Sequence, residues 1–185
     1  MPFLRLMPDS AAATVAIQPA TLADIPTIIE LAEATWEPTY RFIISREQIE
    51  YMYRVIYTPA SLERQMTDEG HRFLVLHCEG HPAGYASFSE RATEPGTFKL
   101  HKLYVLPSHQ GRRLGQQLVA AVEDAAREAG GEWLELNVNR HNPALGFYEH
   151  LGFQQHREED IPIGPYWMND YVMRKPLQAK ILPIS

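Results

Sequence analysis

The residues best suited to chemistry lie in a short loop, Gln110-Gly111-Arg112-Arg113-Leu114-Gly115, between an apolar segment and a helical pattern. The first turn of a helix leaves backbone N–H groups without partners and carries a partial positive charge. Glycines in the loop leave room for an anion beside the backbone, and His109 adds a further basic side chain. This loop can hold a phosphate or pyrophosphate. Two solvated arginines at a helix start would explain the same residues, so both interpretations stay open.

A second group of polar residues follows the alternating segment EWLELNVN at 132–139. Asn142 and Pro143 are the residue types that cap a helix and occupy its first position, so we expect a helix to open there. Tyr148 lies six residues after Asn142, and a phenol has an ordinary pKa of about 10. Tyr148 is therefore a candidate proton donor, although a tyrosine packed under a sheet would produce the same pattern.

The elements on either side of the loop must position these groups. Apolar residues of strand-forming types precede the loop and end before Pro107, which cannot donate to a sheet ladder; they are Phe98, Leu100, Leu103 and Val105. A helical stripe follows the loop, formed by Leu114, Leu118, Val122 and Ala125. Gly130 and Gly131 then supply the residues of a left-handed C-cap. The sequence thus predicts a strand, a loop and a long helix.

The rest of the chain alternates between extended and helical patterns. We expect strands over 14–18, 72–77, 82–89 and 132–139, with a terminal pair at 153–157 and 167–175. Helices are predicted to start near Thr21, Ser45 and Pro59. The aromatic segment TWEPTYRFIIS is predicted to be a loop or a broken helix, and residues 158–160 a solvated acidic loop. The order predicts one α/β domain over 14–178, with flexible tails at 1–13 and 179–185.

Composition narrows the class of protein. An apolar content of 45% and a charged content of 22% are typical of a soluble globular domain, and 185 residues suffice for one core. The net charge of −6 argues against general nucleic-acid binding. The single cysteine, Cys78, excludes an internal disulfide and favours a buried structural thiol. Because neither a membrane span nor a signal-peptide pattern is present, we expect a cytoplasmic protein.

The loop resembles the cofactor-binding motif of the GNAT acyltransferases, Gln/Arg-x-x-Gly-x-Gly/Ala after an apolar strand. Gln110 and Gly115 match that motif, whereas Arg113 stands in place of its middle glycine. The strand end, Leu103-Tyr104-Val105, also fits the family's pattern.

The second group of residues extends the same resemblance. GNAT proteins often carry Asn-x-x-Ala-x-x-x-Tyr-x-x-x-Gly-Phe, and here Tyr148, Gly152 and Phe153 keep the second half, while the first half is spaced differently. The likeness spans about Ile17 to Leu177. It is strongest to uncharacterised bacterial members related to polyamine acetyltransferases.

This resemblance implies the GNAT fold, a mixed and mostly antiparallel sheet flanked by helices, with acetyl-CoA as co-substrate and no metal. In the family, loop amides hold the pyrophosphate and the strand end pairs with the pantetheine arm. The residues thereby implied in acetyl-CoA binding are Leu103, Tyr104, Val105, Gln110, Gly111, Arg112, Arg113, Leu114, Gly115, Gln116, Asn137 and Asn142.

The resemblance also implies direct attack of an amine on the thioester, with a backbone N–H near Val105 stabilising the oxyanion. Tyr148 would then protonate the departing thiolate. Some GNAT enzymes place a glutamate base eleven residues before the first motif residue, where this chain has Lys99. The remaining candidates for the general base are His101 and Glu135. Simple alternation along the strand predicts that His101 lies on the same face as Lys99 and Leu103.

Several functional questions stay open on the sequence. Trp36 and Tyr40 are candidates for an acceptor pocket, but they would serve equally as core anchors. The acceptor implied is a polyamine, another small amine or a peptide amine, and the oligomeric state is either monomer or homodimer. The alternative to an enzyme is a domain of the same fold that binds acyl-CoA without turnover, which the lysine at position 99 would explain.

Overall fold

The structure is a computed structural model, and it describes residues 13–177. The strands are β1 (Val15–Pro19), β2 (Arg72–Cys78), β3 (His81–Glu90), β4 (Thr97–Val105), β5 (Trp133–Asn139), β6 (Gln154–Ile163) and β7 (Tyr166–Pro176). The helices are α1 (Ile25–Tyr40), α2 (Arg46–Ile56), α3 (Pro59–Thr67), α4 (Leu114–Glu128) and α5 (Leu145–His150), with short 3-10 turns η1 (Leu22–Asp24) and η2 (Pro107–His109). The predicted tails lie outside the described residues except for Ala13, which packs against the core.

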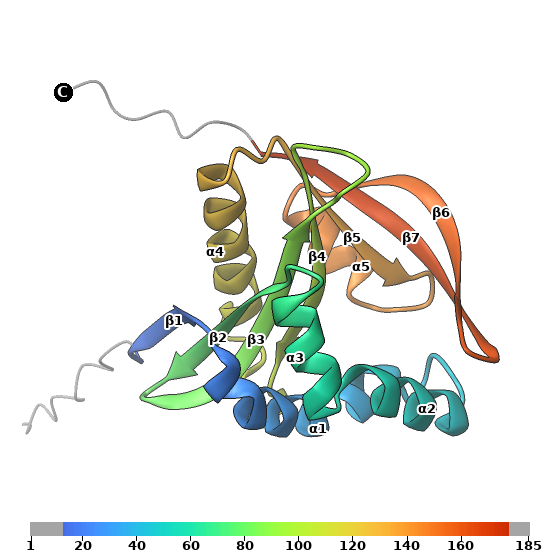
Figure 1. Cartoon of the computed structure of the whole chain (residues 1–185), viewed down its shortest axis with the longest axis horizontal. Helices are drawn as coiled ribbons and strands as arrows, with labels where there is room; N and C mark the ends of the chain where they lie inside the picture. The colour runs from blue at the N-terminus through green and yellow to red at the C-terminus, as the bar shows by residue number, and fades with distance from the viewer. Residues whose placement is uncertain (1–12, 178–185) are drawn as a thin grey trace, which may run out of the picture.

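Seven strands form one sheet in the order β1-β2-β3-β4-β5-β7-β6 (Figure 1). Neighbouring strands are antiparallel except β4 and β5, which run parallel. The mixed, mostly antiparallel sheet expected from the sequence is therefore confirmed. The predicted order of strands and helices is also that of the structure.

The sheet divides at its centre. Pairing between β4 and β5 covers only Thr97–Leu100 against Trp133–Leu136. Beyond that point β4 stays paired with β3 as far as Val105, and β5 stays paired with β7 as far as Asn139. The carboxyl ends of the two strands therefore diverge and leave a gap between two halves of the sheet.

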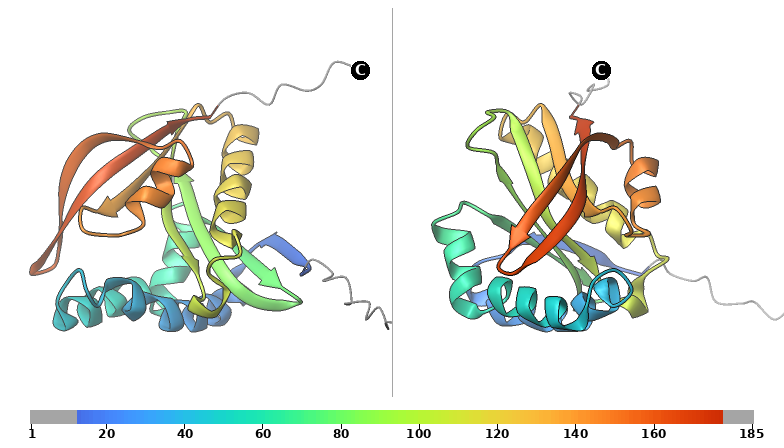
Figure 2. Two further views of the ribbon diagram at one scale, coloured as in Figure 1. Left: turned by 180° about the vertical axis from the view of Figure 1, so that it is seen from behind. Right: turned by 90° about the vertical axis from the view of Figure 1, so that its right-hand side faces the viewer.

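Helices cover both faces of the sheet (Figures 1 and 2). The apolar stripe of α4 packs on one face in a core that also contains residues of β2 to β5, and α5 adds partly buried residues there. A second core lies under α1, α2 and α3 on the opposite face. No helix within residues 13–177 is long and apolar enough to cross a membrane.

Most predicted helix boundaries follow from their capping residues. The Ser45 side chain accepts a hydrogen bond from the Gln48 N–H at the start of α2, and Thr58 caps α3 ahead of Pro59. Gly130 adopts φ +86° after α4, and the Gly131 N–H returns to a carbonyl in the last turn. These contacts confirm the helix starts at Ser45 and Pro59 and the glycine C-cap.

Three local predictions were wrong. The segment TWEPTYRFIIS, predicted to be a loop or a broken helix, continues α1 without a break to Tyr40, and only residues 41–45 lie outside a helix. Pro38 lies in the last turn of this helix, where the Thr39 hydroxyl bonds to the Thr35 carbonyl at 2.7 Å. The burial of Trp36 on the core side, at 5% exposure, favours helix over the local break.

The other two errors concern the C-terminal third. Residues 158–160 form part of the edge strand β6 instead of a loop, and arginine side chains pair with their acidic groups. The helix predicted to open at Asn142 begins only at Leu145. The Asn142 Oδ1 accepts the N–H of Ala144 at 2.9 Å, which closes a local turn before the helix.

Candidate active site

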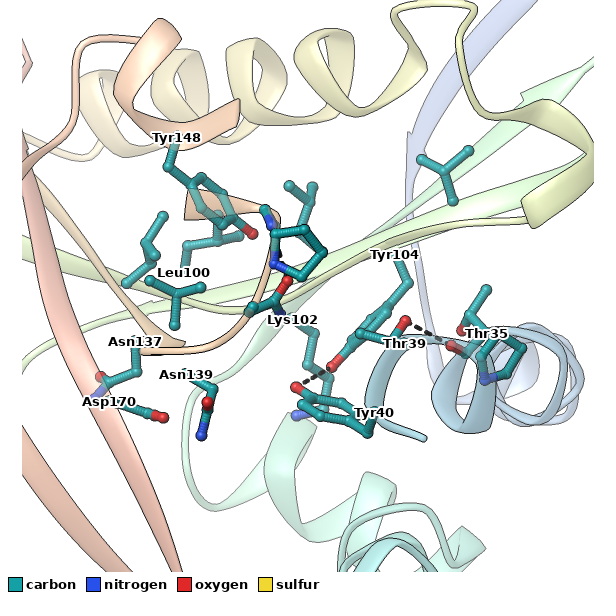
Figure 3. Close-up of a pocket in the computed structure, with 18 of the residues that line it drawn as sticks. Thr35, Thr39, Tyr40, Leu100, Lys102, Tyr104, Asn137, Asn139, Tyr148 and Asp170 are labelled. Atoms are coloured by element: carbon teal, nitrogen blue, oxygen red, sulfur yellow. Dashed lines mark hydrogen bonds between the residues drawn. The ribbon is translucent and has the colours of Figure 1, made fainter. Parts of the chain in front are cut away.

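A cavity of about 520 Å³ opens where β4 and β5 diverge. Figure 3 shows the polar side chains that enter it from several elements. They are Tyr148 of α5, Tyr40 of α1, Tyr104 of β4, Asn137 and Asn139 of β5, and Asp170 of β7. Elements far apart in the sequence thus meet at the gap in the sheet. We refer to this space as the central cavity.

A second cavity lies beside the predicted anion loop, on the face covered by α4 and α5. Its lining includes the loop residues Gln110, Gly111, Arg113, Leu114, Gly115 and Gln116. It shares Leu103, Val105 and Tyr148 with the central cavity, so the two spaces adjoin. Arg112 is exposed and is not part of this lining.

The loop has the geometry that an anion site requires. Gly111 has φ +78° and Arg113 has φ +59°, so both lie in the left-handed region. Arg113 is therefore a non-glycine residue in a conformation that glycine adopts at lower cost, where the related motif has a glycine. The first helical bond runs from the Gln117 N–H to the Arg113 carbonyl, so the amides of residues 114–116 precede the ladder.

Small residues keep the loop open. No atom lies within 4 Å of a Cβ built on Gly111, and a Cβ on Gly115 would meet the Phe147 ring at 3.3 Å. The Gln110 side chain bonds to the Val105 carbonyl at 3.3 Å and so ties the loop to the end of β4. These residues leave room for a phosphate-bearing group beside the loop.

Tyr148 lies where the two cavities join. Its ring packs edge-on against Phe147 and Phe153, with centroids 5.1 and 5.9 Å away. Burial is the main cause that raises its pKa above the ordinary value. The phenol is therefore protonated at neutral pH and faces the gap between β4 and β5.

A third cavity lies on the opposite face, between α1, α3 and the β6–β7 hairpin, and it shares Tyr40, Tyr104 and Asp170 with the central cavity. The hydroxyl groups of Tyr40 and Tyr104 are 3.1 Å apart. Trp36 is a buried anchor that donates its indole N–H to the Ile49 carbonyl at 3.1 Å, and part of its side chain reaches this cavity. A ligand can thus approach the gap from either face of the sheet.

The two predicted bases occupy different surroundings. His101 lines the central cavity, but its ring stacks on His71 with centroids 3.9 Å apart, and its Nε2 lies 2.8 Å from the Ser89 hydroxyl. Burial and neighbouring cations lower the pKa of His101 to about 2. An imidazole with so low a pKa is a poor proton acceptor near neutrality.

Glu135 is 1% exposed and lies outside all three cavities. Arg91, Arg157 and Arg174 surround its carboxylate at 2.5, 3.3 and 3.5 Å. These contacts hold the carboxylate away from the gap, so its surroundings indicate a structural role.

A β-bulge interrupts the alternation of side chains along β4 at His101. The pairing of β3 with β4 shifts between Ser87 and Phe88, which leaves His101 without a ladder partner. His101 shares a cavity with Lys99, as alternation predicts, but Leu103 packs on the α4 side. The expectation that His101 and Leu103 share a face was therefore wrong.

The two asparagines implied in cofactor binding both line the central cavity. The Asn137 amide donates to Glu159 at 3.0 Å. Asn142 uses its side-chain oxygen for the turn before α5. Each therefore already has one local partner.

Sequence reasoning missed two ionisable residues of the site. Lys102 is 8% exposed, donates to Gln65 at 2.6 Å, and has a pKa lowered to about 8 by burial. Asp170 is 5% exposed and lines the central cavity from β7. One signal was present for Asp170, because it alternates with the inward-facing Met168 and Val172 along a strand pattern.

Within residues 13–177 no group of three histidine, cysteine, aspartate or glutamate side chains could hold an ion.

Residues 43–164, which are 122 of the 185 residues, match the protein family described as "Acetyltransferase (GNAT) domain". An "Uncharacterized N-acetyltransferase in pepI 3'region" from Lactobacillus delbrueckii subsp. lactis is 26% identical over 160 residues, or 83% of this chain and 92% of that protein. Spermidine N(1)-acetyltransferase from Thermoplasma acidophilum is 25% identical over 143 residues, or 76% and 89%.

The fold is similar to that of solved structures. The crystal structure of the PaiA N-acetyltransferase from Thermoplasma acidophilum, in complex with coenzyme A, matches with a TM-score of 0.74 and 25% identity. The match covers 88% of this chain and 99% of the PaiA chain. The sequence and the fold therefore agree, and the chain belongs to the GNAT family of acetyltransferases and is an acyltransferase.

Proposed function

We propose that this enzyme transfers the acetyl group of acetyl-CoA to a primary amine by direct attack within a ternary complex. The observation that carries the proposal is the gap between β4 and β5, where the central cavity adjoins a cavity beside the anion loop and a cavity on the opposite face. Two substrates approaching from opposite faces would meet at this gap, beside Tyr148.

Acetyl-CoA would occupy the cavity on the α4 and α5 face, and it supplies the activated thioester. The left-handed Gly111 and the amides of residues 114–116 would hold the pyrophosphate. Leu103 and Val105, at the diverging end of β4, would contact the pantetheine arm. The complex of the related PaiA protein with coenzyme A supports this assignment.

Tyr148 would protonate the departing thiolate. Its phenol remains protonated across the neutral range, and it lines both the cofactor-side cavity and the central cavity. A proton donor at this position would lie where the negative charge of the departing thiolate develops.

The third cavity, on the α1–α3 face, would bind the acceptor, and we call it the acceptor cavity. It is lined by side chains of both charges. Lys99, Lys102 and Asp170 line it together with Tyr40 and Tyr104. A polyamine is the first acceptor to test because one relative acetylates spermidine by its name. An amino acid and a peptide amine complete the panel, since the lysines would suit an acceptor that also carries a carboxylate.

The first experiment is a melting curve with and without saturating acetyl-CoA. At a hundredfold excess over Kd, binding adds about 2.7 kcal/mol to stability, which corresponds to a rise of roughly 5–10 °C in Tm for a chain of this size. Turnover is then followed as release of free CoA thiol with spermidine, L-phenylalanine and a peptide that begins with alanine.

A substitution in the loop tests whether any rise in Tm comes from acetyl-CoA bound there. We expect Gly115→Glu to abolish the rise in Tm, because the new side chain meets Phe147 and brings negative charge to the anion site. Ala120→Glu is the matched control, since it adds the same charge to an exposed position of α4. Acetyl-CoA binding that survives Gly115→Glu would remove the loop assignment, and a wild-type protein without any shift would remove the proposed co-substrate.

A further inference from the structure

Asp170 is a buried carboxylate that faces the gap with part of its hydrogen-bonding capacity unused. Its side chain is 5% exposed, and its Oδ1 is buried without a hydrogen-bond partner. The strand β7 lies between β5 and β6, and Asp170 stands opposite Asn139 on one side and Glu159 on the other. Because leaving a buried carboxylate oxygen unpaired is costly, the oxygen is available for a ligand that the cavity admits.

The residue lies where a second substrate would arrive. Asp170 lines both the central cavity and the cavity on the α1–α3 face, as Tyr40 and Tyr104 do. Figure 3 shows Asp170 beside Asn137 and Asn139, on the side of the cavity across from Tyr40. Tyr148 lines the central cavity with it but belongs to the opposite, cofactor-side cavity as well.

Charged and polar groups reach Asp170 from every neighbouring element: Lys99 of β4, Asn137 of β5, Arg140 after β5, Glu159 of β6 and Tyr40 of α1. Burial is the largest influence and raises the pKa of Asp170 to about 6, against the lowering effects of the Lys99 and Arg140 charges and of a side-chain hydrogen bond from Asn137, while Oδ1 remains without a partner. The carboxylate is therefore mostly ionised at neutral pH, yet it is a much stronger base than an ordinary aspartate.

We infer that Asp170 binds the ammonium group of the acceptor and removes the proton that blocks its attack. This inference rests on the proposed function and names the base that the sequence left open. The carboxylate takes one proton from the ammonium and later releases it to solvent. The freed lone pair forms the C–N bond and the C–S bond breaks. Tyr148 gives its proton to the sulfur, and the second proton lost by nitrogen passes through solvent to the Tyr148 phenolate, which restores the phenol.

The other carboxylates near the gap are already engaged. Glu135 is held by three arginines, and Glu159 accepts the Asn137 amide on the exposed edge strand. His101 is stacked on His71 and bonded to Ser89. Among the acids and histidines lining the central cavity in residues 13–177, Asp170 is the one with an unpaired buried oxygen.

The test is the pH dependence of kcat/KM for wild type and Asp170→Asn, with the fastest acceptor of the amine panel. For wild type we expect an acid limb near pH 6 and a plateau up to the pKa of the amine. For Asp170→Asn only the free amine reacts, so we expect at least a 100-fold loss at pH 7 and a tenfold gain per pH unit up to about pH 10.

Asp160→Asn is the matched control. Its carboxylate lies on the exposed edge strand and pairs with Arg140 and Asn169, so we expect the wild-type profile. Burying the Asp170 charge opposes folding, so Asp170→Asn is expected to melt no lower than wild type at pH 8 and to keep the acetyl-CoA shift.

The outcomes separate the two proposals. An Asp170→Asn enzyme that keeps the shape of the wild-type profile, whatever its rate, would overturn the role of Asp170 and leave the acetyltransferase intact. A wild-type pH profile of kcat/KM that lacks an acid limb near pH 6 would also overturn the role of Asp170 and leave the acetyltransferase intact. Wild-type protein that binds acetyl-CoA but acetylates no amine would overturn the proposed acceptor chemistry, and this inference with it.

Discussion

At the scale of single residues, Tyr148 carries the most direct test of the chemistry. Burial keeps its phenol protonated, so it has a proton to give to the thiolate. Tyr148→Phe removes that proton but keeps the ring that packs on Phe153. We expect kcat to fall by about 10- to 100-fold, at or below the low end of general-acid effects, with an unchanged acetyl-CoA shift in Tm.

A second tyrosine on the same side of the fold serves as the control for Tyr148. Tyr171 of β7 is partly buried against the same core, but it lines none of the three cavities. Tyr171→Phe should therefore keep wild-type kcat. Equal values of kcat for Tyr148→Phe and wild type between pH 7 and 9 would rule out the phenol as the acid.

Local spacing was enough to single out the loop and Tyr148 as candidates, whereas residues that tertiary burial brings to the cavity could not be recognised from the sequence. The anion loop and Tyr148 are marked by glycine spacing and a helix start, which are visible within a few positions. Asp170 lines the cavity because β7 lies between β5 and β6 and faces α1. β5 and α1 are distant from β7 in the sequence. Three arginines from distant segments likewise account for the position of Glu135.

At the scale of elements, the β6–β7 hairpin forms one wall of the acceptor cavity. Its tip leans over α2 in Figures 1 and 2. The Tyr51 and Tyr166 rings contact across this junction, with centroids 5.5 Å apart, and the Gln48 amide donates to the Trp167 carbonyl at 2.9 Å. Ile161 and Ile163 of the hairpin line the cavity below. Docking of the tip on α2 therefore sets the shape of the acceptor side.

Gly164 allows that docking. It has φ +58°, and a Cβ there would collide with the Tyr51 ring and hydroxyl. We expect Gly164→Ala to displace the tip and raise KM for the acceptor about three- to tenfold, with an unchanged Kd for acetyl-CoA, because the loop beside α4 is remote from the hairpin tip. Steady-state kinetics with both substrates varied would measure the two effects separately.

Gly80→Ala is the control for backbone strain, because Gly80 has φ +79° but no atom within 4 Å of the place that a Cβ would take. Both variants carry the cost of a left-handed alanine, roughly 1–2 kcal/mol, but only Gly164→Ala meets Tyr51. A KM that rises equally in Gly80→Ala would mean that general destabilisation, and not the hairpin tip, is responsible.

Elements with explicit boundary residues were predicted well, and those without them were not. Ser45, Thr58 and Gly130 mark helix ends through contacts within one turn. The end of α1 was missed because the burial of Trp36 outweighs the local effect of Pro38. The acidic part of β6 was missed because its charges are paired by the arginines Arg140 and Arg157.

At the scale of the whole molecule, the divergence of β4 and β5 links the fold to the reaction. The order of elements was predictable from alternating patterns, but nothing in the alternation of 97–105 or 133–139 shows where their pairing stops. The stop at Leu100 and Leu136 connects the two faces of the sheet and brings Tyr148 and Asp170 to one cavity. Donor and acceptor would therefore be bound at the same time.

Simultaneous binding predicts sequential kinetics without an acetylated enzyme. The nucleophile best suited to a covalent intermediate, Cys78, is 2% exposed within the core on the α4 face and lines none of the three cavities. We expect Cys78→Ala to keep kcat within about twofold while stability falls by about 1 kcal/mol, as for a small core truncation. Double-reciprocal plots should intersect for both proteins. Parallel plots, together with an acetylated peptide that loses its label when the amine is added, would instead require an acyl-enzyme and a different role for the gap.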